Sequence, residues 1–298
     1  MQRLAAARAA ALDRDRSMST SCFLQRVAGR IALVGIACAC ALGIDVPAIA
    51  DEHPNWDLQI GAGIAYMPDY SGARASSPRL RTWGDGSYRT PDLGTFAIDS
   101  GSLTIDPAFR WDFVDKRDLG LGVLLGYRSG RSDSSPRFAS ANSGSARLAG
   151  LPSIRGSIDA GVEGHVAIFS VPLFAQVRSA TSGSQGMRLN VGAYLPQSLG
   201  SAFELALLPT VTWVDSREMR AFYGVSAQHA AKTGFAAYNP RGAWENAALE
   251  VVGDWQIGIG WHFIASAAYQ RLLGNAAASP LVQTRSQASA VASVAWSF

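Results

Sequence analysis

Charged and polar side chains that could do chemistry recur at every second position in many segments of this chain. A spacing of two puts them on one face of an extended strand, with apolar residues on the other face. Both signs of charge occur on this face, so we expect most of these groups to pair into a structural network. An acidic excess would instead favour cations in a water-filled pore. The candidates are Asp57, Asp106, Arg110, Asp112, Arg128, Asp159, Glu163, His165, Arg178, Arg188, Glu204, Glu250 and His262.

Catalytic chemistry has little support in the sequence. A Ser-His-Asp or Asp-His arrangement could be assembled from His165 or His262, but a chain with many Ser and Asp offers such combinations without specificity. There is no HExxH, CxxC or phosphate-loop pattern, and the three cysteines, Cys22, Cys38 and Cys40, all precede residue 41. We therefore expect no enzyme activity, no metal site and no cofactor.

The N-terminus has the pattern of a secretory signal peptide. Arg26 and Arg30 precede the apolar stretch 31–44, and Ala48 and Ala50 then supply small residues at the positions that signal peptidase requires. A membrane-anchor helix needs about 20 apolar residues, and this stretch is too short. We expect a Sec-type signal that is cleaved near Ala50.

The expected organisation is a signal peptide over residues 1–50 and a single domain over residues 51–298. Met18 would give a signal of more ordinary length, in which case residues 1–17 precede the true start. Residues 1–50 hold six arginines and three aspartates, so 20 basic and 20 acidic residues remain. The net charge of +3 belongs to the removed segment, and nucleic-acid binding therefore has no support.

Residues after position 50 form a series of alternating segments rather than long apolar runs. In the first segment, Trp56, Leu58 and Ile60 alternate with Asp57 and Gln59. Such alternation predicts strands with one apolar and one polar face. The predicted strands are 55–67, 79–90, 94–101, 102–112, 119–128, 154–168, 171–178, 187–195, 203–213, 244–254, 256–271 and 285–298.

Twelve strands of this kind predict an all-β fold, an antiparallel transmembrane β-barrel of the bacterial outer membrane. Such barrels have an even number of strands, because both ends lie in the periplasm. Counting strands from either end puts the turn 115–118 inside and places residues 221–225 in an outer loop that can fold inward. The predicted outer loops are 68–78, 130–152, 215–243 and 272–284, of which 130–152 is expected to be exposed.

A secreted β-sandwich would also alternate, but at this length it would need two domains and a linker, and none is visible. Aromatic residues near the strand ends instead fit the interfacial girdle of a barrel. These aromatic residues are Trp56, Tyr66, Trp111, Tyr127, Trp213, Tyr269 and Trp296.

The last predicted strand, 285–298, has apolar residues at even positions and finishes on Trp296 and Phe298. This ending is typical of the closing strand of an outer-membrane barrel. We expect Trp296 and Phe298 to act as the membrane-insertion signal for the barrel-assembly machinery, and the apolar face to contact outer-membrane lipids.

Several stretches resemble the MltA-interacting protein (MipA/OmpV) family. Residues 61–72, GAGIAYMPDYSG, are similar to the family's opening motif. Residues 148–151, LAGL, residues 222–226, FYGVS, and residues 271–282, RLLGNAAASPLV, look like later segments of the family in the same order. The motif residues in loops are Pro68, Asp69, Tyr70, Gly72, Tyr223, Gly224, Ser279 and Pro280.

This resemblance implies a non-catalytic protein of the outer membrane. The family's namesake is a scaffold that brings a membrane-bound lytic transglycosylase together with a murein-synthesising penicillin-binding protein, and other members look like porins or adhesins. A small-solute porin is therefore the alternative function. The predicted periplasmic turns are short, whereas a specific interface needs about 800 Å² on each partner.

Overall fold

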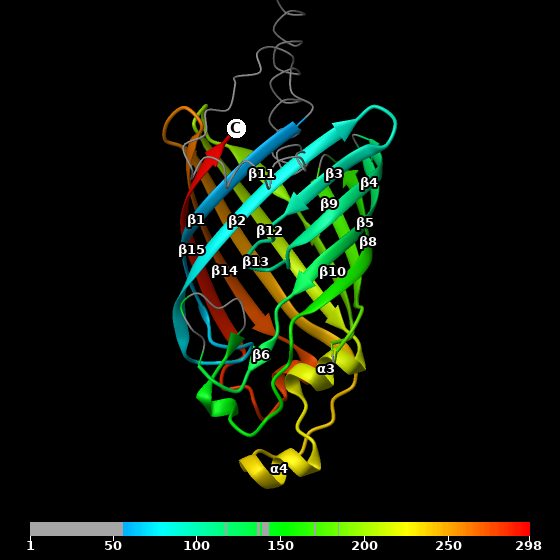
Figure 1. The fold of residues 1–298 in the computed structure, drawn as a ribbon, viewed down its shortest axis with the longest axis vertical. Helices are drawn as coiled ribbons and strands as arrows, with labels where there is room; N and C mark the ends of the chain where they lie inside the picture. The colour runs from blue at the N-terminus through cyan, green and yellow to red at the C-terminus, as the bar shows by residue number, and fades with distance from the viewer. Residues whose placement is uncertain (1–55, 117, 136–137, 139–142, 170, 184) are drawn as a thin grey trace, which may run out of the picture.

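The computed structural model describes residues 56–116, 118–135, 138, 143–169, 171–183 and 185–298. The expected signal peptide 1–50 lies outside these residues. The described chain forms a closed antiparallel β-barrel, as predicted (Figure 1). Its strands are β1 Trp56–Pro68, β2 Ser76–Thr90, β3 Gly94–Asp99, β4 Ala108–Lys116, β5 Leu119–Arg128, β8 Ser157–Ile168, β9 Val171–Ala180, β10 Met187–Ala193, β11 Leu195–Ser198, β12 Phe203–Val214, β13 Ala243–Gln256, β14 Trp261–Leu272 and β15 Ser286–Ser297.

The wall has twelve strand positions, because β10 and β11 are two parts of one strand interrupted at Tyr194. Both parts pair with β12, and β10 pairs with β9 on its other side. The barrel closes where β1 pairs with β15, with Ile60 opposite Trp296. Closure leaves no long open edge of the sheet, which a wall surrounded by lipid requires.

Alternation along the strands produces the two faces of the wall. In β5 every second residue is exposed, from Leu119 to Tyr127, and the residues between them are buried. The apolar face points outward, where lipid replaces water as the solvent for these side chains. The polar faces of all strands therefore meet in the lumen.

Long and short connections lie at opposite ends of the barrel. The start of β1 and the end of β15 lie with the short turns (Figure 1), and this arrangement identifies the short-turn end as periplasmic. The long outer loops contain β6 Arg131–Ser132, β7 Ser143–Gly144, the 3-10 helix η1 Ala146–Leu148, α3 Ser216–Tyr223, α4 Ala227–Thr233 and α5 Gly274–Ala277. Within the described part of the chain, no helix has the length and apolar character needed to span a membrane.

The predicted strand 102–112 begins too early, because only its second half, from Ala108, belongs to a strand. β3 ends at Asp99 and β4 begins at Ala108, and the loop 100–107 between them turns into the lumen. Leu103 alternates with polar neighbours as a strand residue would, but its amide donates to the carboxylate of Glu250 on β13 at 3.1 Å. This tertiary contact overrides the local pattern.

Two further predictions need correction. The predicted strand 256–271 begins only at Trp261, since Gly260 has a positive φ of 70° and residues 257–260 form a turn. The loop 130–152 is not simply exposed, because Arg131, Leu148 and Leu151 are buried. A run rich in Ser, Gly and Arg suggested a solvated loop, but its few apolar residues pack against other loops.

Candidate functional site in the lumen and its cap

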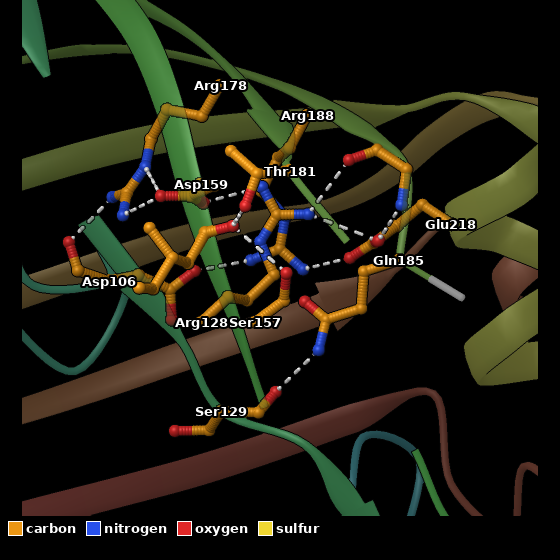
Figure 2. A network of polar contacts seen from close by, with 12 residues as sticks. Asp106, Arg128, Ser129, Ser157, Asp159, Arg178, Thr181, Gln185, Arg188 and Glu218 are labelled. Atoms are coloured by element: carbon orange, nitrogen blue, oxygen red, sulfur yellow. Dashed lines mark hydrogen bonds and ion pairs between the residues drawn. The ribbon is translucent and has the colours of Figure 1, made fainter. Parts of the chain in front are cut away.

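An ion network joins strands in the outer half of the lumen. Arg128 donates to Asp159 Oδ2 at 2.9 Å, and Arg178 donates to Asp159 Oδ1 at 2.8 Å (Figure 2). All three side chains are almost completely buried. A buried carboxylate between two guanidinium groups is stable only because each charge has a partner, so these contacts brace β5, β8 and β9 against one another.

Glycines on the inward face of β5 make room for this packing. A Cβ at Gly126 would collide with the Arg178 guanidinium, and a Cβ at Gly120 would collide with the ring of His165. The alternation of leucine and glycine in β5 thus creates an apolar wall outside and space for large polar side chains inside.

Glu218 extends the network from the wall into α3. Its Oε2 lies 3.1 Å from Arg128 Nη1, and its Oε1 lies 2.9 Å from Arg188 Nη2. The amide of Gly186 also donates to Glu218, at 2.8 Å. Glu218 has 0% relative exposure, and its contacts hold α3 against the outer mouth of the barrel (Figures 1 and 2).

The inward loop 100–107 forms a second connection across the lumen. Asp106, which was predicted to lie on a strand, belongs to this loop and accepts a hydrogen bond from Arg188 at 2.9 Å. Glu250 accepts hydrogen bonds from the Leu103 amide and from Thr104 Oγ1. Because β3 and β13 stand nearly opposite in the strand order, the loop spans the interior and narrows it.

Arg110 and Glu163 form a third group, with Arg110 Nη1 3.0 Å from Glu163 Oε1. Arg110 also pairs with Asp112, and Gln176 donates to Glu163. His165 lies on the same face of β8 as Glu163 and is half-buried against β5. β5 lies between β4 and β8 in the sheet, so the Arg110–Glu163 ion pair reaches across the inward face of β5.

Near the periplasmic end, His262 Nδ1 lies 2.8 Å from Asp254 Oδ1, and both residues are buried. Glu204 stands opposite Asp254 in the ladder between β12 and β13 and is half-buried. The His262–Asp254 pair has the geometry of a base and its orienting acid. Among the described residues, no serine is hydrogen-bonded to the ring of His262, and no group of three or more His, Cys, Asp and Glu residues could hold a metal ion.

The outer loops pack together into a cap at the outer mouth, which we define as segments 69–75, 144–154, 215–242 and 273–285. Two clusters of buried apolar residues hold the cap together. The first is Tyr70, Ala73, Leu148, Leu151, Val225 and Leu281. The second, beside α3, is Val214, Met219, Tyr223, Leu272 and Ala276.

Family-motif residues from distant parts of the chain meet in the cap. Tyr70 donates its hydroxyl to the carbonyl of Leu281 at 3.0 Å, and Ser279 donates to the carbonyl of Tyr223 at 2.7 Å. Gly72 has φ 96°, and its amide donates to Gln287 at 2.8 Å. The Asp69 carboxylate accepts a hydrogen bond from the Ser77 hydroxyl. Pro68 is the last residue of β1, and Gly224 is the C-cap of α3. Pro280 is half-buried beside Ser279.

Tyr223 connects the cap to the lumen. Its hydroxyl lies 2.6 Å from Ser71 Oγ and donates to Glu245 Oε1 at 2.8 Å. Burial, with the nearby Glu245 carboxylate, raises the pKa of the Tyr223 phenol well above its usual range. Arg131, whose pKa burial lowers to about 10, donates to the carbonyl of Phe222. The residues predicted to form a loop that folds inward, 221–225, thus lie at the centre of the cap.

Sequence reasoning missed Glu218 and α3. The segment DSREM carries a recognisable signal, since Asp215 caps α3 by accepting from the amide of Glu218 at 2.8 Å. An N-capping Asp with an acidic residue three positions later is a helix start. Within a predicted outer loop, that signal points to an ordered helix.

The terminal strand has the predicted outward aromatics. Trp296 packs edge-to-face against Trp261, with ring centroids 5.1 Å apart, and against Phe298 at 6.5 Å. The amide of Phe298 donates to the carbonyl of Leu58 at 3.0 Å. The end of the chain is therefore anchored in the wall, and its role as an insertion signal stays a prediction.

Solved structures with similar folds are outer-membrane proteins. OprB of Pseudomonas putida has a TM-score of 0.39 and 8% identity, over 82% of this chain and 94% of its own. The translocator domain of the autotransporter NalP from Neisseria meningitidis has a TM-score of 0.40 and 11% identity, over 95% of this chain and 98% of its own. The COG4313 outer membrane channel from Pseudomonas putida F1 has a TM-score of 0.36 and 10% identity, over 86% of this chain and 100% of its own. At these values the likenesses carry no weight for function.

A search of curated proteins found no match to this chain. The sequence profile described as MltA-interacting protein MipA matches residues 60–298. The matched region begins in β1 and includes all four motif stretches, which have residues in the cap. The chain therefore belongs to the MipA family of outer-membrane β-barrel proteins.

Proposed function

We propose that this protein is a non-catalytic scaffold of the outer membrane that takes part in peptidoglycan synthesis. It would hold a lytic transglycosylase of the MltA type and a murein-synthesising penicillin-binding protein together at the periplasmic face. The description of the family as MltA-interacting supports the first partner. The second partner follows only from the family's namesake role.

The locked cap is the observation that carries this proposal. Glu218 is fully buried between Arg128 and Arg188, and Met219 and Tyr223 of the same helix belong to a buried apolar cluster. Removing such a charge from its partners is costly, so α3 is held at the outer mouth as a stable part of the fold. This supports an anchoring role, in which the periplasmic end is the working surface.

Binding to purified partners tests the scaffold function. The barrel in lipid nanodiscs would be exposed to MltA and to the penicillin-binding protein of the same bacterium, with empty nanodiscs as the control. We expect saturable binding of each enzyme and simultaneous retention of both. No retention of either enzyme would overturn the proposal.

A small-solute pore is the second candidate, and loop 100–107 is the observation in its favour. The loop is hydrogen-bonded to Glu250 and narrows the lumen where polar side chains line it. A pore selects solutes by size and charge at such a constriction. Planar-bilayer recording separates the two candidates, since steady conductance steps support the pore and conductance at background level rejects it.

A further inference from the structure

The periplasmic rim of the barrel has an uncharged apolar half and a charged half. Three consecutive turns, β8–β9, β11–β12 and β13–β14, are neighbours in the strand order. Their sequences are AIFSVPL at 167–173, LPQSLGSAF at 195–203 and WQIGIGW at 255–261, which contain no Asp, Glu, Lys or Arg. The other two turns, RTPDL at 89–93 and VDKRDL at 114–119, are charged.

Each of the uncharged turns has a large apolar side chain that is exposed. Phe169 is 97% exposed, Ile259 is 92% exposed and Leu199 is 58% exposed. A single exposed apolar residue is common on a protein surface, but several on adjacent turns can form a patch of the kind that marks an interaction site. We call Phe169, Leu199 and Ile259 the apolar arc.

Phe169 is also in an unfavourable backbone conformation for its type. Its φ is 49°, and it is the only residue other than glycine with positive φ in the described part of the chain. It directly follows β8, at the connection to β9, and Asn or Gly would be the usual choice for a positive φ in a tight hairpin. A residue in a strained conformation whose side chain makes little contact with its own fold is a candidate for a role other than folding.

The position of Ile259 argues against membrane lipid and a second copy of the barrel as the occupant of the arc. Trp255 and Trp261 are outward-facing aromatics at the ends of β13 and β14 and mark the level of the lipid headgroups. Ile259 lies beyond both of them in the turn, on the periplasmic side of that level. A second copy in the same membrane points its own rim in the same direction, so it cannot cover this one.

Peptidoglycan and the chain's own residues 51–55 are also poor occupants. Glycan strands are polar, and the sequence of 51–55, DEHPN, is charged, so neither matches an uncharged apolar surface. We propose that the apolar arc is a docking surface for a periplasmic protein that presents an uncharged apolar patch. This inference rests on the proposed scaffold function and assigns the docking to one half of the rim.

Site-specific photo-crosslinking in living cells tests the inference. The crosslinker p-benzoylphenylalanine would be placed at position 169 or 259 in the arc. Position 93 is the matched control, because Leu93 is 57% exposed on the charged half of the rim. Adducts would be identified by mass spectrometry, and folding of each barrel would be checked by its heat-dependent shift on a gel.

We expect adducts with a periplasmic protein at positions 169 and 259 but not at 93. The Ile259→Asn substitution should lower the yield at position 169 at least tenfold. The conservative variant Ile259→Leu should keep the yield. Adducts with lipid alone, no adducts, or equal yields at position 93 would overturn the docking surface.

The identity of the adduct separates this inference from the proposed function. An adduct with MltA supports both. An adduct at the arc with a different periplasmic protein supports the docking surface and contradicts the MltA assignment. Binding of MltA to nanodiscs together with adducts only at position 93 supports the scaffold and overturns the apolar arc.

Discussion

The two ends of the barrel use their apolar side chains in opposite ways. At the outer end, the cap buries Met219, Tyr223 and Leu281 in contacts within the chain itself. At the periplasmic end, the apolar arc exposes Phe169 and Ile259 in short turns that give them little to pack against. A surface already satisfied by its own chain has little to offer a partner, so this contrast points to the periplasmic rim as the place of interaction.

Of the substitutions considered, Glu218→Ala should cause the largest loss of stability in the cap. The substitution takes one carboxylate from the buried Arg128 and the half-buried Arg188, which keep Asp159 and Asp106 as partners. Breaking a buried pair costs about 3–5 kcal/mol, and we expect a loss near the lower end of that range. Thermal unfolding in detergent and hydrogen exchange of α3 would measure the loss. Asp118→Ala, in an exposed turn, is the control and should change stability by less than about 0.5 kcal/mol. Equal effects of both substitutions would show that Glu218 does not lock the cap.

Replacing Tyr223 with Phe should have a smaller effect on the cap. The change removes the hydroxyl that contacts Ser71 and donates to Glu245, and a buried group that loses its hydrogen bond costs about 1–3 kcal/mol. Equilibrium unfolding would measure this. Tyr238→Phe removes a bond to the Asn275 carbonyl at a half-buried position and should cost less. A larger loss of stability in Tyr238→Phe than in Tyr223→Phe would contradict the central place of Tyr223 in the cap.

The cap should lose stability at alkaline pH. The Tyr223 pKa is raised in the folded protein, whereas the phenol ionises near pH 10 in an unfolded chain. Its contribution is therefore fully present below about pH 10 and declines above it, because only the unfolded state releases the proton. The free energy of unfolding should fall less between pH 8 and pH 11 in Tyr223→Phe than in the original chain. Identical losses would contradict this.

Replacing Phe169 with Asn should have the smallest effect on stability. Asn tolerates positive φ better than Phe, and relief of the strain stabilises the turn by at most about 1 kcal/mol. The thermal midpoint should therefore stay the same or rise, while docking at the rim is lost. A clear fall of the midpoint would show that Phe169 serves the fold rather than a partner.

Much of the barrel follows from the sequence, because lipid imposes a simple rule on each strand. Outward residues such as Leu121 and Val123 must be apolar, and inward residues are free to be polar. The number of strands and the positions of the outer loops follow from this alternation and from the even strand count. The loop 100–107 was missed because Leu103 and Ile105 have a strand spacing, and only the distant contact with Glu250 makes them a loop.

The site was harder to predict than the fold. Alternation indicates that Asp159 and Arg178 face inward, but it cannot show that they meet. Pairing depends on the strand register and on space beside glycines such as Gly126. Glu218 lies in a loop, where alternation carries no information, and its burial depends on how α3 folds back into the mouth.

Binding of MltA to nanodiscs is the most direct test of the difference between the two ends, if three forms of the barrel are compared. These are the original chain, the cap variant Glu218→Ala, and the rim variant with Phe169→Asn and Ile259→Asn together. The rim variant should lose binding at least tenfold, and the cap variant should bind as the original chain does. Loss of binding in the cap variant with full binding in the rim variant would contradict the assignment of the interaction to the periplasmic rim.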